Sequence, residues 1–356
     1  MWYYLELFCS IFTNPIARLM FIGSFLLGIT SGILGIFINL KKKILIGDVL
    51  SHTVLPGIAI AYIIANSTSE WVIWLGAFGS AIVSLSLIEI IKRYSKIKFD
   101  TILSLMIASF FGLGNVLIAY AQKGSEDCSI AVLEKFILGQ IALISETHVI
   151  IIGVLTFITI LTICVLWKEF KIFTFDEQLS QSLGFNNIIL TLIMNALLIG
   201  LVIISLKITG VILTSAFLIM PGIIARHLSD KLLVNIILVS FISFLSSFIG
   251  INMSLYIEQM PTGPIIIVIS TCFILLTCLF ARTNGIFKKF LKQKQYQRKI
   301  KKFKQLIHFY HNNKSQDIVE IESFLLEEKY LHKESGKILV TGKGIKLVEN
   351  LIKGEF

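Results

Sequence analysis

Hydrophobic positions dominate the first 281 residues, in runs of roughly 20 separated by short polar or charged links. A helix needs about 20 mostly apolar residues to cross the hydrocarbon core of a bilayer. The runs predict nine spanning helices, near residues 15–38, 48–66, 71–91, 101–121, 147–167, 187–206, 208–226, 232–256 and 263–281. The alternative is eight spans, because the link at 207–210 is short enough to join a full span to a half-helix.

The composition also indicates a membrane protein. Hydrophobic residues make up 55% of the chain and charged residues 15%, whereas soluble domains carry roughly 45–50% and about 25%. There is too little polar surface to cover a water-soluble core. The five cysteines are scattered without a CxxC pair, so neither a disulfide framework nor a zinc knuckle is indicated.

Basic residues are distributed unequally between the two sets of loops that nine spans create. With the N-terminus outside, the cytoplasmic loops hold eleven lysines and arginines and the outer loops hold four. Because cytoplasmic loops carry the excess of positive charge, this predicts a multi-pass protein of the plasma or inner membrane with a cytoplasmic C-terminus. The eleven are Lys41, Lys42, Lys43, Lys92, Arg93, Lys96, Lys98, Lys168, Lys171, Arg226 and Lys231.

Two segments between spans are longer than a turn. Residues 122–146 contain an apolar stretch that is too short to span and is interrupted by Glu134 and Lys135, which predicts a surface-lying or re-entrant piece on the outer side. Residues 168–186 predict a short amphipathic helix on the inside, with Phe175, Leu179 and Leu183 on one face and Gly184 as its stop. Such a helix either rests on lipid headgroups or docks onto a cytoplasmic partner.

The composition changes abruptly after residue 281. Residues 282–356 hold 17 basic and 8 acidic residues, a balance that suits anionic membrane lipid or, as the less favoured alternative, nucleic acid. We expect a transmembrane domain over 1–287, a basic amphipathic linker helix over 288–314 and a small extension over 315–356. The extension is similar to the second half of a winged helix-turn-helix domain, with a helix over 317–328, a hairpin turning at 334–336 and a closing helix over 347–353. The predicted fold class is therefore an all-α polytopic membrane protein with a small cytoplasmic α+β winged-helix-like C-terminal extension.

One pair of ionisable residues lies inside an apolar segment, in GDVLSHTVLPGIAIAY at 47–62. Charged residues within a span are costly and usually functional. Asp48 and His52 are four apart, so on a helix they share a face and can bind a divalent transition metal. Alternatively, Asp48 caps the helix and His52 bonds a neighbouring helix. Pro56 and Gly57 favour a functional site, because a broken helix is tolerated only against protein or a water-filled cavity.

This chain is not expected to bind and hydrolyse ATP itself. The sequence has no GxxxxGK[ST] motif, so it carries no P-loop ATPase of its own. No nucleophile and base arrangement appears either, so we do not expect an enzyme. Any ATP hydrolysis is expected in a separate subunit.

The segment at 47–62 resembles the integral-membrane permease subunits of the manganese, zinc and iron ABC importers. The resemblance extends in order through FILGQIALIS, FDEQLSQSLGF, KITGVILTSAFLIMPGIIAR and MPTGPIIIVIS, and covers most of 15–281. Thr53 and Gly222 depart from the family pattern, which usually has alanine at both positions. The resemblance does not cover 288–356.

The resemblance implies a divalent-metal permease with Asp48 and His52 as metal ligands of the transport path. The metal is the transported substrate, and no cofactor is expected. The expected partners are a cytoplasmic ATP-binding subunit, an extracytoplasmic metal-binding protein and a second permease, as a homodimer or a sister chain. The helix that contacts the ATPase falls on Phe175, Asp176, Leu179, Leu183 and Gly184.

Two other functions remain open from the sequence. The chain could be a permease for a metal chelate, such as a siderophore complex or cobalamin. It could also be a membrane-tethered, metal-responsive regulator that binds DNA through 288–356. Among the metals themselves, a carboxylate and imidazole pair accepts manganese, zinc and iron alike.

Overall fold

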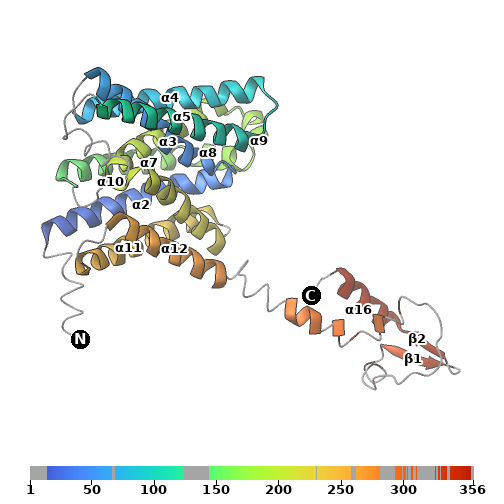
Figure 1. The fold of residues 1–356 in the computed structure, drawn as a ribbon. Coiled ribbons are helices and arrows are strands. Elements are labelled where there is room, and N and C mark those ends of the chain that lie inside the picture. Colours follow the sequence, from blue (N-terminus) through green and yellow to red (C-terminus); the bar gives the residue numbers. More distant parts are fainter. Residues whose placement is uncertain are drawn as a thin grey trace. The chain divides into compact units, whose positions relative to one another are not determined.

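The protein divides into two compact units, Met1–Cys278 and Leu279–Phe356 (Figure 1). Their description rests on a computed structural model. The residues it describes in the first unit are 14–65, 69–123, 144–229, 231–257 and 262–278. In the second unit they are 279–280, 293–298, 300–301, 303, 306–307, 310, 325, 328, 330–334 and 337–353.

The first unit is a bundle of helices, as the apolar runs predict. Its elements are α2 (Pro15–Leu40), α3 (Leu45–Ala65), α4 (Glu70–Tyr94), α5 (Phe99–Lys123), α7 (Glu146–Val165), α8 (Trp167–Phe175), α9 (Glu177–Ser182), α10 (Asn187–Leu228), α11 (Leu232–Tyr256) and α12 (Thr262–Phe280). Seven helices of the described residues are long and apolar enough to cross a membrane, among them α10 through its first part, Asn187–Leu206. A shorter apolar stretch, Thr262–Thr277, lies in α12. The polytopic all-α prediction is confirmed in this form, and the count of nine spans stays a prediction.

Local sequence signals set the boundaries of α2. The Asn14 side chain accepts a hydrogen bond from the Ile16 N–H at 3.1 Å, and Pro15 occupies the first helical position. At the other end Lys42 has a positive φ of 56°. The helix stops there, since a residue in the left-handed region directs the chain away from the helix axis.

The two segments expected at 187–206 and 208–226 meet at a break inside the expected link at 207–210. They form the single element α10, with a kink at Gly210, whose φ of 74° and ψ of 171° are not helical. Three buried hydroxyls surround the kink: Thr214 donates to the Gly210 carbonyl at 2.7 Å and lies within hydrogen-bonding distance of Ser205 and Thr209. These hydroxyls give the break a buried polar lining, and such polar side chains help a membrane helix to tolerate a kink.

The centre of the bundle is formed by α2, α3 and α10. More than half of the apolar window of α2 and of α3 is buried, whereas α4, α5 and α7 bury less than a third of theirs. The approach of α2 to α10 is close at Gly35, where a Cβ atom would overlap the Leu218 carbonyl oxygen. Small residues permit such contacts between membrane helices. The helix that carries Asp48 and His52 therefore lies in the interior of the bundle.

The second unit contains the predicted hairpin. Strands β1 (Leu331–Glu334) and β2 (Lys337–Val340) pair antiparallel, with Glu334 opposite Lys337. The predicted closing helix lies within α16 (Gly342–Lys353). A small core is formed by Leu306, Leu325 and Val348.

Two other predictions fall mainly on residues that the structure does not describe. These are the helix expected over 317–328 and the re-entrant or surface piece expected over 122–146. The winged-helix assignment therefore stays a prediction.

Candidate functional site

Asp48 and His52 face each other within α3. The Asp48 Oδ1 and His52 Nε2 atoms are 3.5 Å apart, and their side chains are 31% and 19% exposed. Ligand bonds of about 2.1 Å at tetrahedral or octahedral angles separate two donor atoms by roughly 3.0–3.5 Å, so this pair can hold one cation with little movement. The helix begins at Leu45, three residues before Asp48, so Asp48 is inside the helix rather than at its N-cap.

Two other helices contact the pair. The edge of the His52 ring packs against Phe111 of α5, with ring centroids 5.1 Å apart at an interplanar angle of 83°. The Asp48 carboxylate accepts a hydrogen bond from Ser215 of α10. The second ring nitrogen of His52, Nδ1, is buried and has no hydrogen-bond partner within the described part of the chain. Packing and the Asp48 contact therefore hold the ring.

The α3 turn that follows His52 is supported by α4. Pro56 lacks the N–H that would bond the His52 carbonyl one turn earlier. Next to it, the Thr53 carbonyl accepts a hydrogen bond from Ser80, and the Thr53 and Ser84 hydroxyls are 3.0 Å apart. The irregular turn thus lies against protein, as a broken helix in a membrane requires. Thr53, which departs from the family pattern, has a direct partner here.

The supporting residues on other helices were not identified from the sequence. Phe111 and Ser215 are far from Asp48 along the chain, and no local pattern points to them. Ser80 and Ser84 did carry a signal, because with Gly76 they form a stripe of small residues every fourth position of α4. Such stripes mark close helix contacts in membranes.

Asp48 and His52 form a group of only two candidate ligands within the described residues. Among the described residues, no group of three or more His, Cys, Asp or Glu side chains could hold a metal ion. A second carboxylate and imidazole pair, Glu70 and His148, joins the beginnings of α4 and α7 at 3.2 Å. It also has only two members.

The segment predicted to contact an ATPase consists of two short helices instead of one. Asp176 has extended backbone angles and separates α8 from α9, and its carboxylate caps α9 by accepting from the Gln178 and Leu179 N–H groups at 2.9 and 3.0 Å. An aspartate favours this break because it can bond free N–H groups at a helix start. Gly184, with a φ of 84°, ends the segment as predicted.

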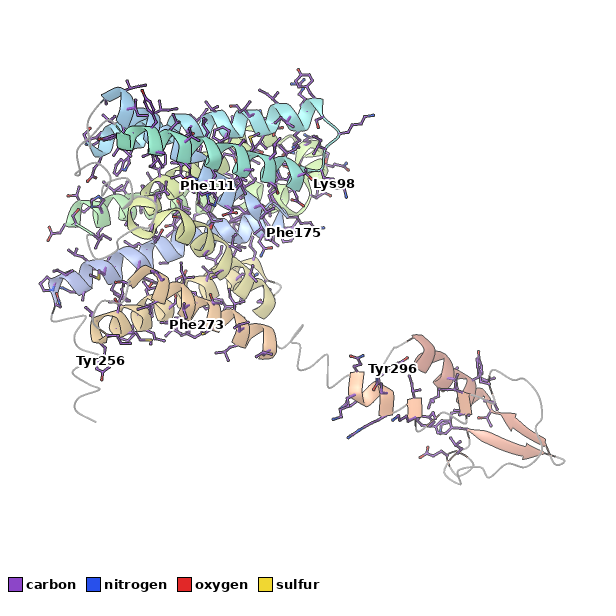
Figure 2. All side chains as sticks on the ribbon, in the orientation of Figure 1. Lys98, Phe111, Phe175, Tyr256, Phe273 and Tyr296 are labelled. Atoms are coloured by element: carbon purple, nitrogen blue, oxygen red, sulfur yellow. The ribbon has the colours of Figure 1, made fainter. Side chains whose placement is uncertain are left out.

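The apolar side chains of this segment divide into two sets. Phe170 and Phe173 are buried against the bundle. Phe175, Leu179 and Leu183 are 61%, 48% and 55% exposed, and Figure 2 shows Phe175 at the same end of the bundle as Lys98. The second set leaves an apolar surface uncovered beyond the membrane-spanning helices.

Comparison with known proteins identifies the class of protein. Residues 14–281 match the ABC 3 transport family, and the chain belongs to this family. The match confirms the family resemblance drawn from the motifs between 47 and 270.

Individual relatives agree with the family. The chain is 30% identical over 311 residues to the manganese transport system membrane protein MntC of Bacillus subtilis, covering 87% of this chain and 71% of that protein. It is 30% identical over 285 residues to the zinc transport system membrane protein TroC of Treponema pallidum, covering 80% of this chain and 95% of that protein. Among solved structures, PsaBC from Streptococcus pneumoniae in complex with Fab has a TM-score of 0.69 at 26% identity, covering 80% of this chain and 99% of that one.

Proposed function

We propose that this chain is the membrane permease subunit of an ABC importer that moves a divalent metal ion, manganese, zinc or iron, into the cytoplasm. The Asp48 and His52 pair carries the proposal, because it places an oxygen and a nitrogen donor 3.5 Å apart inside a membrane helix. Relatives that transport manganese and zinc by name support the same substrate class. A bare ion needs few ligands, and two side chains suit a site that must release its ion.

The proposed orientation puts the α2–α3 turn and the helices α8 and α9 on the cytoplasmic side. The turn and α8 carry lysines that follow the positive-inside rule. Lys41 of the turn contacts Glu177 of α9, so the turn and α9 lie at one end of the bundle. An ATP-binding subunit would dock on the apolar surface of Phe175, Leu179 and Leu183, and a metal-binding protein would deliver ions at the opposite side.

A second permease, either another copy or a sister chain, completes the proposed transporter. Two ligands from one chain leave most of the coordination shell of a divalent metal unfilled. Water molecules or a facing Asp48 and His52 pair would supply the remainder. The partly exposed position of both side chains in the single chain is consistent with such a pairing.

The C-terminal region is proposed as a cytoplasmic appendage. We assign 1–287 to the permease domain, 288–314 to a basic linker helix and 315–356 to a winged-helix-like extension. The β1–β2 hairpin followed by α16 supports the last assignment. Membrane lipid is the favoured contact of the basic linker, and nucleic acid is the alternative.

Metal uptake into proteoliposomes that hold the assembled transporter tests the proposal. With the three metals in competition, Asp48→Ala and His52→Ala should each abolish uptake while the ATPase still assembles. His148→Ala is the matched control, because it removes the imidazole of the Glu70 pair and should leave uptake intact. Normal uptake by the Asp48→Ala/His52→Ala double variant would remove the pair from the mechanism.

A further inference from the structure

The lysine that follows α2 is buried against the α8–α9 segment. The Lys41 side chain is only 6% exposed, and its Nζ lies 2.8 Å from Glu177 Oε1 and 2.9 Å from the centre of the Phe173 ring. A buried ammonium is unfavourable unless it is paired, and both contacts favour its charged form. Since Phe173 belongs to α8 and Glu177 to α9, one lysine holds both short helices.

The same lysine begins the turn that leads into the metal-binding helix. Backbone hydrogen bonds of 3.0 Å run from the Lys42 N–H to Asn39 and from the Lys43 N–H to Ile38, which is the pattern of a tight helix-ending turn. The Ile46 N–H then donates to the Lys43 carbonyl at 3.1 Å. The short turn after Lys41 is therefore hydrogen-bonded to α2 and, through Lys43 and Ile46, to the first turn of α3.

The side chains of helix α9 divide into those that contact the bundle and those that are exposed. Glu177, its first residue, directs its carboxylate toward the bundle, while Leu179 remains exposed. Asn187 at the start of α10 donates to the Glu177 carbonyl at 2.8 Å and accepts from Ser180 at 2.6 Å. The helix is thus a small rigid piece between an exposed apolar surface and the α2–α3 turn.

A cavity beside Lys41 gives the contact room to change. Its volume is about 60 Å³, and its lining includes Lys41, Lys43, Glu89, Phe173 and Asn195. A space of this size holds water and offers polar groups to a displaced ammonium. The cavity therefore leaves space next to Lys41 into which its side chain could move.

We propose that Lys41 and Glu177 are positioning residues that transmit movement of α9, when the ATPase acts on it, to the Asp48 and His52 turn of α3. The inference rests on the proposed function, because it deepens the link between ATP hydrolysis and the metal path. A variant that tests the pair must keep the buried ammonium partnered, because an unpaired buried charge destabilises the fold. Glu177→Gln does so, since its amide oxygen can still accept a hydrogen bond from Lys41.

The test measures metal ions imported per ATP hydrolysed, using the full transporter in proteoliposomes. Glu177→Gln keeps the shape of the side chain and removes its charge. We expect it to bind the ATPase normally, to hydrolyse ATP and to import roughly two- to tenfold less metal per ATP. Glu169→Gln is the matched control on α8, since Glu169 has no salt bridge to a lysine among the described residues, and it should behave as the unmodified protein.

A double-variant cycle distinguishes a direct pair from separate effects. Lys41→Met should lower the import ratio to a similar extent, and Lys41→Met with Glu177→Gln should be no worse than either alone. Additive losses, or a normal import ratio in Glu177→Gln, would overturn the proposal. Loss of ATPase binding in Glu177→Gln would also overturn it and assign Glu177 to the docking surface. If the unmodified transporter imports no metal, the proposed function itself fails.

Discussion

Gly57 of α3 and Gly76 of α4 lie backbone to backbone, so that a Cβ atom on either would overlap the carbonyl oxygen of the other. This contact lies one turn beyond His52 and holds α3 against the helix that supplies Ser80 and Ser84. The close approach requires glycine at both positions. The geometry of the turn with Asp48 and His52 therefore depends on two glycines that have no side chain to bind a metal.

Gly76→Ala should destabilise the protein, because its added methyl group has no space. Overpacking of this kind costs about 1–3 kcal/mol. Gly79→Ala on the same helix is the control: a Cβ there meets nothing within 4 Å, and alanine favours a helix by up to about 1 kcal/mol. Thermal unfolding in detergent measures the difference. Equal melting temperatures for the two variants would contradict the close packing.

Phe111→Ala should weaken metal binding without abolishing transport. Its ring edge packs against His52, and such aromatic contacts contribute about 0.5–1.5 kcal/mol. We expect KM for metal uptake to rise by roughly two- to tenfold, a factor that follows from this energy. Leu113→Ala is the control, because Leu113 is on the same helix and 50% exposed. An unchanged KM for Phe111→Ala would show that the ring does not position His52.

The fold was predicted well from the sequence because apolar runs of bilayer length are a strong signal. The prediction was less accurate where a single residue changes the local backbone. Asp176 divides the expected amphipathic helix because its carboxylate bonds the N–H groups of α9. Gly210 lies in the short link expected at 207–210, where its backbone makes a kink between the two expected spans. Both depend on hydrogen bonds that periodicity does not represent.

The candidate site was only partly predictable for a similar reason. Asp48 and His52 are close along one helix, so their spacing is enough to bring them together. Phe111, Ser215 and Lys41 act from other elements, and their positions depend on how the helices pack. One sequence without homologues gives no information on such pairings, except where small residues repeat along a helix face.

Leu179→Glu should prevent docking of the ATP-binding subunit. Burying a leucine side chain contributes about 1.5–3 kcal/mol, and a charge in its place is unfavourable. Binding to the ATPase should fall at least about tenfold. Gln178→Glu adds the same charge at the adjacent exposed position and serves as the control. If Leu179→Glu and Gln178→Glu bind the ATPase equally well, the apolar surface of α9 is not the docking site.

Coupling should depend on pH through Lys41. Burial lowers the pKa of Lys41 from 10.5 to about 8, although the Glu177 hydrogen bond and charge oppose it and Lys43 and Lys92 add to it. Partial burial raises the pKa of Glu177, but the hydrogen bond and charges of these lysines outweigh it and the net direction is downward. The pair is therefore charged at neutral pH and loses its positive partner above pH 8.

We expect metal imported per ATP to fall as pH rises through about 8. Over the same window the Lys41 contribution to folding stability should rise, because the unfolded lysine, with its pKa of 10.5, binds more proton than the folded one. Thermal unfolding measured at each pH therefore shows whether a fall in import per ATP comes from lost coupling or from loss of the folded protein. Lys41→Arg keeps its charge and should show a flat profile to pH 9. A parallel fall in Lys41→Arg would assign the pH effect to another group.

Truncation after Lys289 should leave metal import intact. The chain divides into two units near residue 278, the family match ends at residue 281 and the second unit has its own small core around Leu306 and Val348. The transport helices through α12 remain in this variant. Uptake should be measured together with membrane insertion and ATPase binding, so that a failure of assembly is recognised. A truncated permease that inserts and binds its ATPase but imports no metal would place the C-terminal unit inside the transport cycle. Normal import would mean that the 17 basic residues after residue 281 act at the membrane surface or in regulation. Binding of the full-length protein and of the truncated protein to anionic vesicles and to DNA would then be compared, and the ligand that only the full-length protein retains identifies lipid or nucleic acid as the contact.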